Sequence, residues 1–278
     1  MLILALDSSS LTLSCALVEV AEVGAPGERA ESAVRVLAES LHPPPDKAGD
    51  LLPQALEAVC AQSGKRLDEV SAMAVGTGPG SFTGLRIGIA AAKGLCYARR
   101  WPLAGASSLH ALALAAAPHA RAGQLIISTA EARRGELYAA SWRSTSEHQY
   151  NDVITVHAVA AEAVYRAEAF AALLRGLEEV PLVVGPGAAA CADQLSAAGV
   201  DLTALAPPDA PRTPSAAAIA RLCAPALRGA SFDAVALFAL APNYFKPSEA
   251  EIALSEGRVG GLPASSLNPQ TVTNRSVR

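Results

Sequence analysis

The sequence has 278 residues, enough for one large domain or for two lobes of about 100 to 150 residues each. Half of the residues (51%) are hydrophobic and only 4% are aromatic, so alanine, leucine and valine must build the core. The formal charge of -4 gives no electrostatic footprint for gripping nucleic acid unaided.

The cysteines and the N-terminus bear on the cellular compartment. The five cysteines form no CxxC pair, which argues against a disulfide framework or a zinc knuckle, and we expect buried thiols in a reducing compartment. The apolar run at the N-terminus stops after Leu6 and follows no basic region, so it is too short for a signal peptide. No stretch approaches the ~20 uninterrupted apolar residues of a membrane span. We therefore expect a cytoplasmic protein without membrane contact.

The first 118 residues alternate strand-like and helix-like patterns. In chain order, the predicted elements are a buried strand at 2–6, a polar turn at 7–10, a returning strand at 11–18, a connection at 21–33, a strand at 34–41, an amphipathic helix at 50–63, a strand at 70–75, a glycine-rich loop at 76–84, a helix at 84–99, a strand at 102–105 and a helix at 107–116.

The sequence PHARAGQ then indicates a boundary, after which the pattern restarts. The later elements are a strand at 124–129, a polar turn at 131–136, an alternating strand at 137–142, a strand at 181–185, a glycine-led helix at 186–199 and a helix at 214–229. We expect an N-terminal lobe at 1–118, a C-terminal lobe at 119–250 and a loose tail at 251–278, which has no periodicity.

The two halves resemble each other. Each opens with a strand, an acid-bearing polar turn and a second strand, with Asp7 in the first half and Glu131 in the second. Each later has a glycine-rich strand-to-helix turn, at 76–84 and at 185–187. This repeat predicts an internally duplicated, two-lobed α/β fold.

The segment GTGPGSFTGLRIG at 76–88 carries five glycines and is the most distinctive motif. It is not a Walker A loop, because Leu85 stands where the lysine after Gly84 is required. It matches the dinucleotide fingerprint poorly, because Ser81 replaces the third glycine and Pro79 removes an amide. Three interpretations stay open: a packing turn, which is favoured, an anion or nucleotide site, and a turn that presents the next helix to a partner.

The composition of this loop requires a tight backbone. Its glycines allow positive φ or the close approach of a neighbouring chain, and Ser81 or Thr83 can cap the helix that follows. The residues to which we assign this structural role are Gly76, Gly78, Pro79, Gly80, Ser81, Phe82, Thr83, Gly84 and Arg86.

The helix after the loop carries small residues. Gly88, Ala91 and Ala92 lie at i, i+3 and i+4, so they share a face, and Leu95 extends that face by one turn. Small residues would let a partner helix approach closely. The alternative is that this face packs against the protein's own sheet.

The remaining candidates for chemistry are weaker. The five histidines form no HxxxH or HExxH motif, and the chain has no G-x-S-x-G elbow. Asp7 could hold a metal-bound phosphate at the first turn, but a cap on its own turn through Ser9 or Ser10 is favoured. Arg133 and Arg134 lie in the second turn, where a solvated turn is the default interpretation.

Four segments together resemble a known family. ILALDSSSLTLSCAL, the loop GTGPGSFTGLRIG with its helix, EARRGELYAASW and APNYFK occur in this order, and the chain is similar over roughly residues 1–247 to the bacterial TsaB (YeaZ) family. That family supplies the dimerisation subunit of the tRNA threonylcarbamoyladenosine machinery. The resemblance implies a two-lobed fold of the actin, sugar-kinase and heat-shock ATPase class (ASKHA), in agreement with the internal repeat.

The resemblance implies a scaffold subunit that has no catalytic residues, no metal and no cofactor. Its implied partners are a TsaD-type catalytic subunit and a TsaE-type ATPase, with tRNA contacted only through the complex and a homodimer of the isolated chain left open. The implied pairing helices match residues 50–63 and 84–99. The residues predicted for this interface are Leu52, Ala55, Leu56, Val59, Gly88, Ala91, Ala92 and Leu95. Asp7, Ser8, Glu131 and Arg133 mark a vestigial nucleotide site.

The chain departs from the family pattern in three ways. Glu131 stands where the family usually has an aspartate, the histidine that the family often has near Lys47 is missing, and the connection at 19–33 is longer. Two other functions stay open. A sugar-kinase-like ATP-binding enzyme would need glycine with lysine or threonine after the first aspartate, where three serines stand here. A metallopeptidase would need ligands that the sequence lacks.

Overall fold

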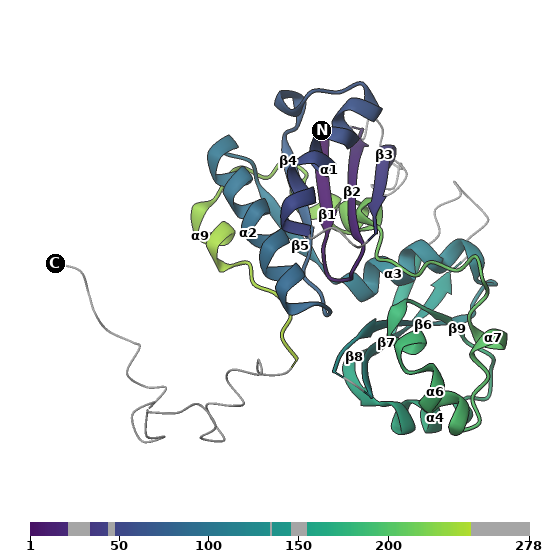
Figure 1. The fold of residues 1–278 in the computed structure, drawn as a ribbon. Coiled ribbons are helices and arrows are strands. Elements are labelled where there is room, and N and C mark those ends of the chain that lie inside the picture. Colours follow the sequence, from purple (N-terminus) through teal and green to yellow (C-terminus); the bar gives the residue numbers. More distant parts are fainter. Residues whose placement is uncertain (22–33, 44–47, 134, 146–154, 246–278) are drawn as a thin grey trace, which may run out of the picture. The chain divides into compact units, whose positions relative to one another are not determined.

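The computed structural model describes residues 1–21, 34–43, 48–133, 135–145 and 155–245 (Figure 1). Residues 1–243 form one structural unit. The predictions for most of the 19–33 connection, for Lys47 and for the tail at 251–278 lie outside the described residues.

A five-stranded mixed sheet opens the chain, in the order β3-β2-β1-β4-β5. Strands β1, β2 and β3 are antiparallel neighbours, whereas β4 and β5 run parallel to β1. The elements of this part are β1 (Leu2–Asp7), β2 (Leu13–Val20), β3 (Val34–His42), α1 (Ala48–Ser63), the 3₁₀ turn η2 (Leu67–Glu69), β4 (Ala72–Gly76), α2 (Phe82–Arg99), β5 (Leu103–Ala106) and α3 (Ser108–Ala116).

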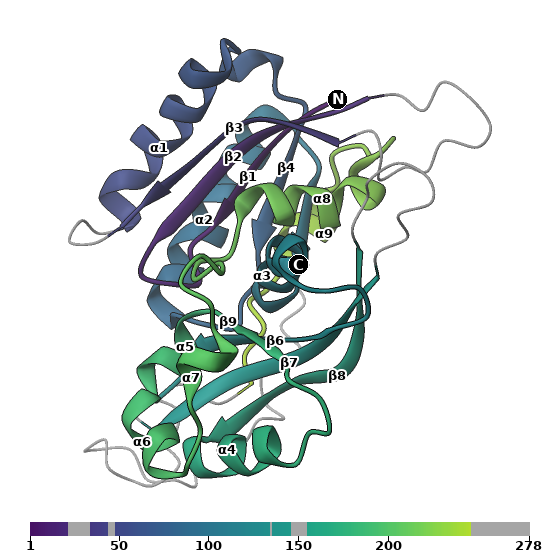
Figure 2. The same cartoon turned by 90° about the vertical axis from the view of Figure 1, so that its right-hand side faces the viewer.

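Side chains alternate between the two faces of this sheet, as the two-residue period of a strand requires. On β1, Leu4 and Leu6 face a core that α1 and α2 complete, whereas Ile3 and Ala5 face a core completed by α8 (Ala216–Leu227). Figure 2 shows α1 and α8 on opposite sides of the sheet. Both faces are therefore buried, which explains why β1 is apolar up to its final residue.

A second, four-stranded sheet has the order β8-β7-β6-β9. One of its faces packs against α3 and the other against α4, α5 and α6. The elements of this part are the 3₁₀ turn η3 (Ala117–His119), β6 (Leu125–Glu131), β7 (Glu136–Thr145), β8 (Thr155–Arg166), α4 (Ala167–Arg175), β9 (Leu182–Val184), α5 (Pro186–Ala190), α6 (Ala192–Ala197) and α7 (Leu202–Leu205). Helix α9 (Ala234–Ala239) belongs instead to the first part, where its Leu237 packs in the core that α1 and α2 complete.

The two sheets repeat one topology. In each, the first strand pairs antiparallel with the next strand and parallel with a strand that follows a crossover, as β1 pairs with β2 and β4 and β6 pairs with β7 and β9. The predicted repeat of strand, turn and strand is thus present in the backbone.

Helix α3 belongs to both cores. Its Ala111 contributes to the core between the first sheet and α8, whereas Leu109, Leu112 and Ala116 contribute to the core of the second sheet. Helix α8 comes late in the chain and returns to the first sheet. The predicted division at residues 118 and 250 remains a proposal.

One sequence-based element prediction is wrong, and several elements of the structure have no counterpart among the predictions. The helix predicted at 186–199 is broken at Cys191, whose backbone leaves helical geometry between α5 and α6. Strand β8 and helix α4 are missing from the predicted elements, although β8 spans 12 residues.

Candidate functional site

The glycine-rich loop between β4 and α2 packs directly against the turn between β1 and β2. Gly78 and Gly80 adopt positive φ values of 88° and 156°, which side-chain-bearing residues disfavour. A Cβ on Gly84 would lie 2.1 Å from the carbonyl oxygen of Ser8, and one on Gly76 would lie 1.9 Å from Oδ2 of Asp7. The loop therefore needs glycine for its conformation at 78 and 80, and for close approach to the turn at 76, 80 and 84.

Several backbone amides of the loop are already used within the chain. The Thr77 amide donates to the Ala106 carbonyl at 2.8 Å, and the Ser81 amide donates to the Ser9 carbonyl at 2.6 Å. Gly78 donates to Oγ of Ser108, and Gly84 donates to Oγ of Ser81, which caps α2. A phosphate cradle needs free amides that converge on one point. This loop instead uses these four donors for its own fold.

Asp7 is the buried acid at the end of β1. Its Oδ1 accepts hydrogen bonds from the amide and the hydroxyl of Ser9, at 2.9 and 2.6 Å, and its Oδ2 accepts one from the Ser108 hydroxyl at 2.5 Å. Burial raises the pKa of the Asp7 carboxyl, and the hydrogen bonds from Ser108 and Ser9 oppose that rise. The favoured prediction, a cap through Ser9, agrees with this geometry; the sequence gives no sign of the bond to Ser108.

The four residues of the predicted vestigial nucleotide site differ in their surroundings. Asp7 and Ser8 are buried, and the Ser8 hydroxyl donates to the Gly84 carbonyl at 2.8 Å. Glu131 ends β6 and is exposed, as is Arg133 in the following turn. The first pair thus contributes to the packing of the loop, while the second pair lies at the surface.

Much of the predicted pairing surface lies in the protein's own core. Leu52, Ala55, Val59 and Ala92 are buried between α1, α2 and the first sheet. Gly88 is buried as well, and a Cβ there would lie 2.1 Å from Oγ of Ser8. These five residues face inward and pack against the protein's own core, and not toward a partner.

The remaining three residues, Leu56, Ala91 and Leu95, are half-buried at the edge of the same core. Exposed residues of α2 form a solvent-facing line along the helix. They are spaced four residues apart at Phe82, Arg86, Ala90 and Gly94, and Tyr97 follows three residues later. Tyr97 is 53% exposed, and the guanidinium of Arg86 lies 5.1 Å from the ring centre of Phe82.

A segment from the end of the described chain, residues 232–243, runs over α2 and reaches the loop; we call it the return segment. The Asn243 amide donates to the Thr77 carbonyl at 2.8 Å, and Nζ of Lys93 donates to the Phe238 carbonyl at 3.0 Å. Tyr97 contacts the rings of Phe232 and Phe238. The motif APNYFK, which contains Asn243, is the sequence signal that lies nearest to this contact.

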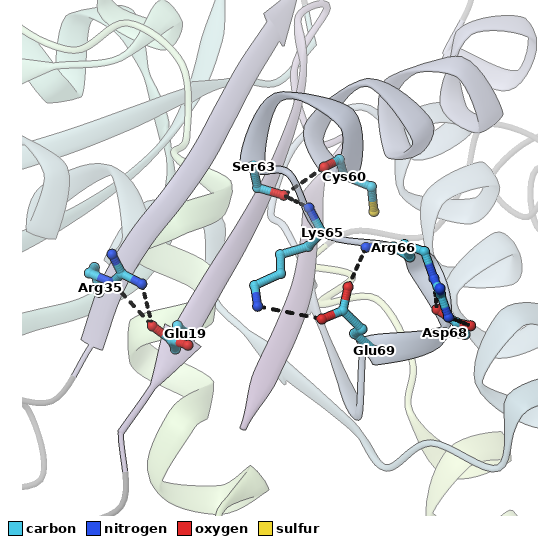
Figure 3. Close-up of polar contacts among 8 residues, drawn as sticks. All are labelled: Glu19, Arg35, Cys60, Ser63, Lys65, Arg66, Asp68 and Glu69. Carbon is cyan, nitrogen blue, oxygen red and sulfur yellow. Dashed lines mark hydrogen bonds and ion pairs between the residues drawn. The ribbon is translucent and has the colours of Figure 1, made fainter.

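The polar groups where α1 ends are structural (Figure 3). The Ser63 hydroxyl donates to the Cys60 carbonyl, and Lys65 pairs with Glu69 at 3.4 Å. Arg66 pairs with Asp68 close by, and Arg35 pairs with Glu19 on the neighbouring strands β3 and β2. Exposed ion pairs of this kind add little stability.

Metal and thiol chemistry find no support among the described residues. They contain no group of three or more His, Cys, Asp or Glu side chains that could hold a metal ion. All five cysteines are buried, and burial raises the pKa of the Cys15, Cys96 and Cys223 thiols to about 12. In the same part of the chain, no helix is both long and apolar enough to cross a membrane.

Comparison with a solved structure defines the fold class. A Pseudomonas aeruginosa structure, described as an uncharacterised protein with similarity to peptidase YeaZ, covers 88% of this chain and 99% of its own, with a TM-score of 0.62 and 24% identity. This likeness confirms the predicted two-lobed α/β fold, and at this identity it concerns the fold alone.

Sequence comparison defines the family. The family model of TsaD, tRNA N6-adenosine threonylcarbamoyltransferase, matches residues 49–254, which is more than half of the chain. The chain therefore belongs to this family. Within it, the likeness to two curated TsaB proteins confirms the resemblance that the motifs indicate.

Two curated relatives carry the name tRNA threonylcarbamoyladenosine biosynthesis protein TsaB. The Escherichia coli (strain K12) protein is 34% identical over 129 residues, covering 46% of this chain and 53% of its own length. The Haemophilus influenzae protein is 34% identical over 136 residues, covering 49% and 51% respectively. The chain thus matches about half the length of these curated relatives.

Proposed function

We propose that this chain is a non-catalytic scaffold subunit in the synthesis of threonylcarbamoyladenosine in tRNA. Its curated relatives are named for this biosynthesis. The observation that carries the scaffold role is the engagement of Asp7 and of four loop amides by the chain's own groups. Groups that would otherwise hold a phosphate or a metal are committed to packing.

The proposed partners are a TsaD-type catalytic subunit and a TsaE-type ATPase, with tRNA contacted through the complex in the cytoplasm. The proposed pairing surface lies on α1 and α2. Since five of the eight predicted residues face inward, the surface consists of half-buried Leu56, Ala91 and Leu95 together with the solvent-facing line of α2.

Co-purification tests the pairing. The chain and the TsaD-type subunit of the same organism are produced together, with a tag on one of them, and the complex is measured by size exclusion with light scattering. We expect a stoichiometric complex. Two separate peaks at micromolar concentrations of both proteins would contradict the proposal.

A second measurement tests the absence of catalysis. The purified chain alone should neither hydrolyse ATP nor transfer threonylcarbamoyl to tRNA. ATP hydrolysis that persists through successive purification steps and in proportion to the chain's concentration would support the sugar-kinase-like alternative, and threonylcarbamoyl transfer by the chain alone would contradict the scaffold role.

A further inference from the structure

The start of helix α3 joins the two sheets through polar contacts. Ser107 and Ser108 are adjacent, and each hydroxyl donates to a carboxylate from a different sheet. Ser108 donates to Asp7 of β1 at 2.5 Å, and Ser107 donates to Glu162 of β8. The two acceptors therefore come from opposite halves of the sequence.

Each hydroxyl also accepts a backbone hydrogen bond. Ser108 Oγ accepts from the Gly78 amide at 3.0 Å, and the Ser108 amide in turn donates to the Gly78 carbonyl at 2.9 Å. Ser107 Oγ accepts from the His110 amide at 3.1 Å and so caps α3. Both hydroxyls therefore donate and accept, which fixes the rotation of each O–H bond.

Glu162 lies at a bulge, where the pairing of strands β7 and β8 shifts its register. Strands β7 and β8 pair Ala139 with Ala163 and then Ser141 with Ala160, so two residues of β8 lie opposite one residue of β7. A bulge of this kind redirects the side chain that it carries. Glu162 is one of the two bulged residues and is only partly buried.

The apolar contacts of α3 do not by themselves determine how the two sheets are oriented relative to each other. Ala111 packs into the core of the first sheet, and Leu109 and Leu112 pack into that of the second. Apolar burial is non-directional, whereas hydrogen bonds to carboxyl oxygens require a narrow geometry.

We propose that Ser107 and Ser108, with Glu162 and Asp7 as their acceptors, form a two-sided junction that holds the two sheets in one fixed relation. The junction converts a helix shared by two cores into a rigid connection. It is a conformational device of the chain itself, so its test needs no partner and is independent of the proposed function.

The test is a distance measurement between the sheets. Gln54 of α1 and Gln194 of α6 are exposed, and the substitutions Gln54→Cys and Gln194→Cys provide one nitroxide label beside each sheet. The native thiols are buried and react slowly, because burial raises their pKa and excludes the reagent. Pulsed electron spin resonance then reports the distribution of distances.

The variants remove the hydrogen bonds to the two sheets without removing the Ser107 cap of α3. Glu162→Ala removes the acceptor on the second sheet and leaves the Ser107 cap on His110 intact. Ser108→Ala removes the link to Asp7, and the two changes are then combined. Ser71→Ala is the matched control, since its hydroxyl donates only within the first sheet, to the Leu2 carbonyl at 3.2 Å.

We expect one narrow distance in the unmodified chain and in Ser71→Ala, a broadened distribution in each single junction variant, and loss of the narrow peak in the double variant. A narrow distribution in the folded double variant would overturn the proposal and assign the fixed relation to the apolar contacts of α3. If the double variant does not fold, Glu162→Ala decides, because its site is partly exposed. An unchanged distribution there would equally overturn the proposal.

Discussion

Close packing and hydrogen bonds decide which side chains the positions around Asp7 can accept. Gly84 has a negative φ, so the obstacle to a side chain there is the Ser8 carbonyl oxygen, which would lie 2.1 Å from a Cβ. Gly94 lies in the same helix, is exposed, and would have no atom within 4 Å of its Cβ. These two glycines of α2 form a natural pair for comparison.

Gly84→Ala should lower the free energy of unfolding by about 1–3 kcal/mol, because the backbone of Ser8 must move. Gly94→Ala should raise it by about 0.5–1 kcal/mol, because alanine favours a helix interior. Urea denaturation of both variants checks the contrast. Equal effects of the two changes would show that the loop and the first turn are not in tight contact.

The Asp7 carboxyl should make stability depend on pH. Burial raises its pKa in the folded state above 3.8, so the folded protein holds this proton more tightly than the unfolded chain does. Its contribution to stability is full below 3.8 and is lost as the pH rises from there through the folded-state pKa. The stability of the unmodified chain relative to Asp7→Asn should fall by up to about 1.4 kcal/mol per pH unit in that window.

Denaturation of both proteins at a series of pH values upward from about 4 provides the measurement. The asparagine of the Asp7→Asn variant cannot ionise, so the difference between the two curves isolates the carboxyl. A difference that is constant with pH, or that grows in favour of the unmodified chain, would mean that the hydrogen bonds from Ser9 and Ser108 outweigh burial.

Elements with strong local signals follow from the sequence, and others do not. The predicted bounds of strand β1 and helix α2 agree with the structure to within two residues, because one is continuously apolar and the other begins at a glycine turn with a serine cap. Strand β8, TVHAVAAEAVYR, escapes prediction because its alanines favour a helix and its bulges destroy the two-residue period. Strand β8 forms because it pairs antiparallel with β7, and its own sequence does not indicate a strand.

Helix α2 offers three adjacent alanines in graded surroundings. Ala90 is exposed, Ala91 is half-buried and Ala92 is fully buried. Ala92→Glu should destabilise the fold by several kcal/mol (order of magnitude), because it buries an unpaired charge. Ala90→Glu should leave the melting temperature unchanged and abolish pairing with the TsaD-type subunit, if that subunit contacts the solvent-facing line of α2.

Ala91→Glu should lie between the two, with a modest loss of stability and a loss of pairing. Thermal unfolding and co-purification are measured for all three variants. A folded Ala90→Glu chain that pairs as well as the unmodified chain would place the partner surface elsewhere on the molecule.

At the scale of the whole molecule, the sequence predicts the repeated strand-turn-strand pattern but not how later segments return. Helix α8 packs on the first sheet, and the return segment reaches Thr77 through Asn243. Both contacts join residues far apart in the chain, and no local pattern encodes the pairing. The same reason explains why the sequence does not single out Ser107, Ser108 and Glu162.

The charge of the molecule predicts weak binding of tRNA by the isolated chain. A net charge of -4 provides few cations to neutralise phosphates, on which non-specific affinity depends. A gel-shift titration at two salt concentrations should show weak binding with a shallow salt dependence. Tight binding that falls steeply with salt would indicate a basic tRNA surface on the chain itself.

The central proposal is that the chain contributes to threonylcarbamoyl transfer without carrying the catalytic groups. It is tested by reconstitution with the TsaD-type subunit, the TsaE-type ATPase, tRNA and the activated threonylcarbamoyl donor, omitting one protein at a time. We expect modified tRNA only when this chain is present, and expect activity to survive Asp7→Asn wherever that variant folds and pairs. Full activity without the chain, or loss of activity in a folded and pairing Asp7→Asn complex, would contradict the scaffold role.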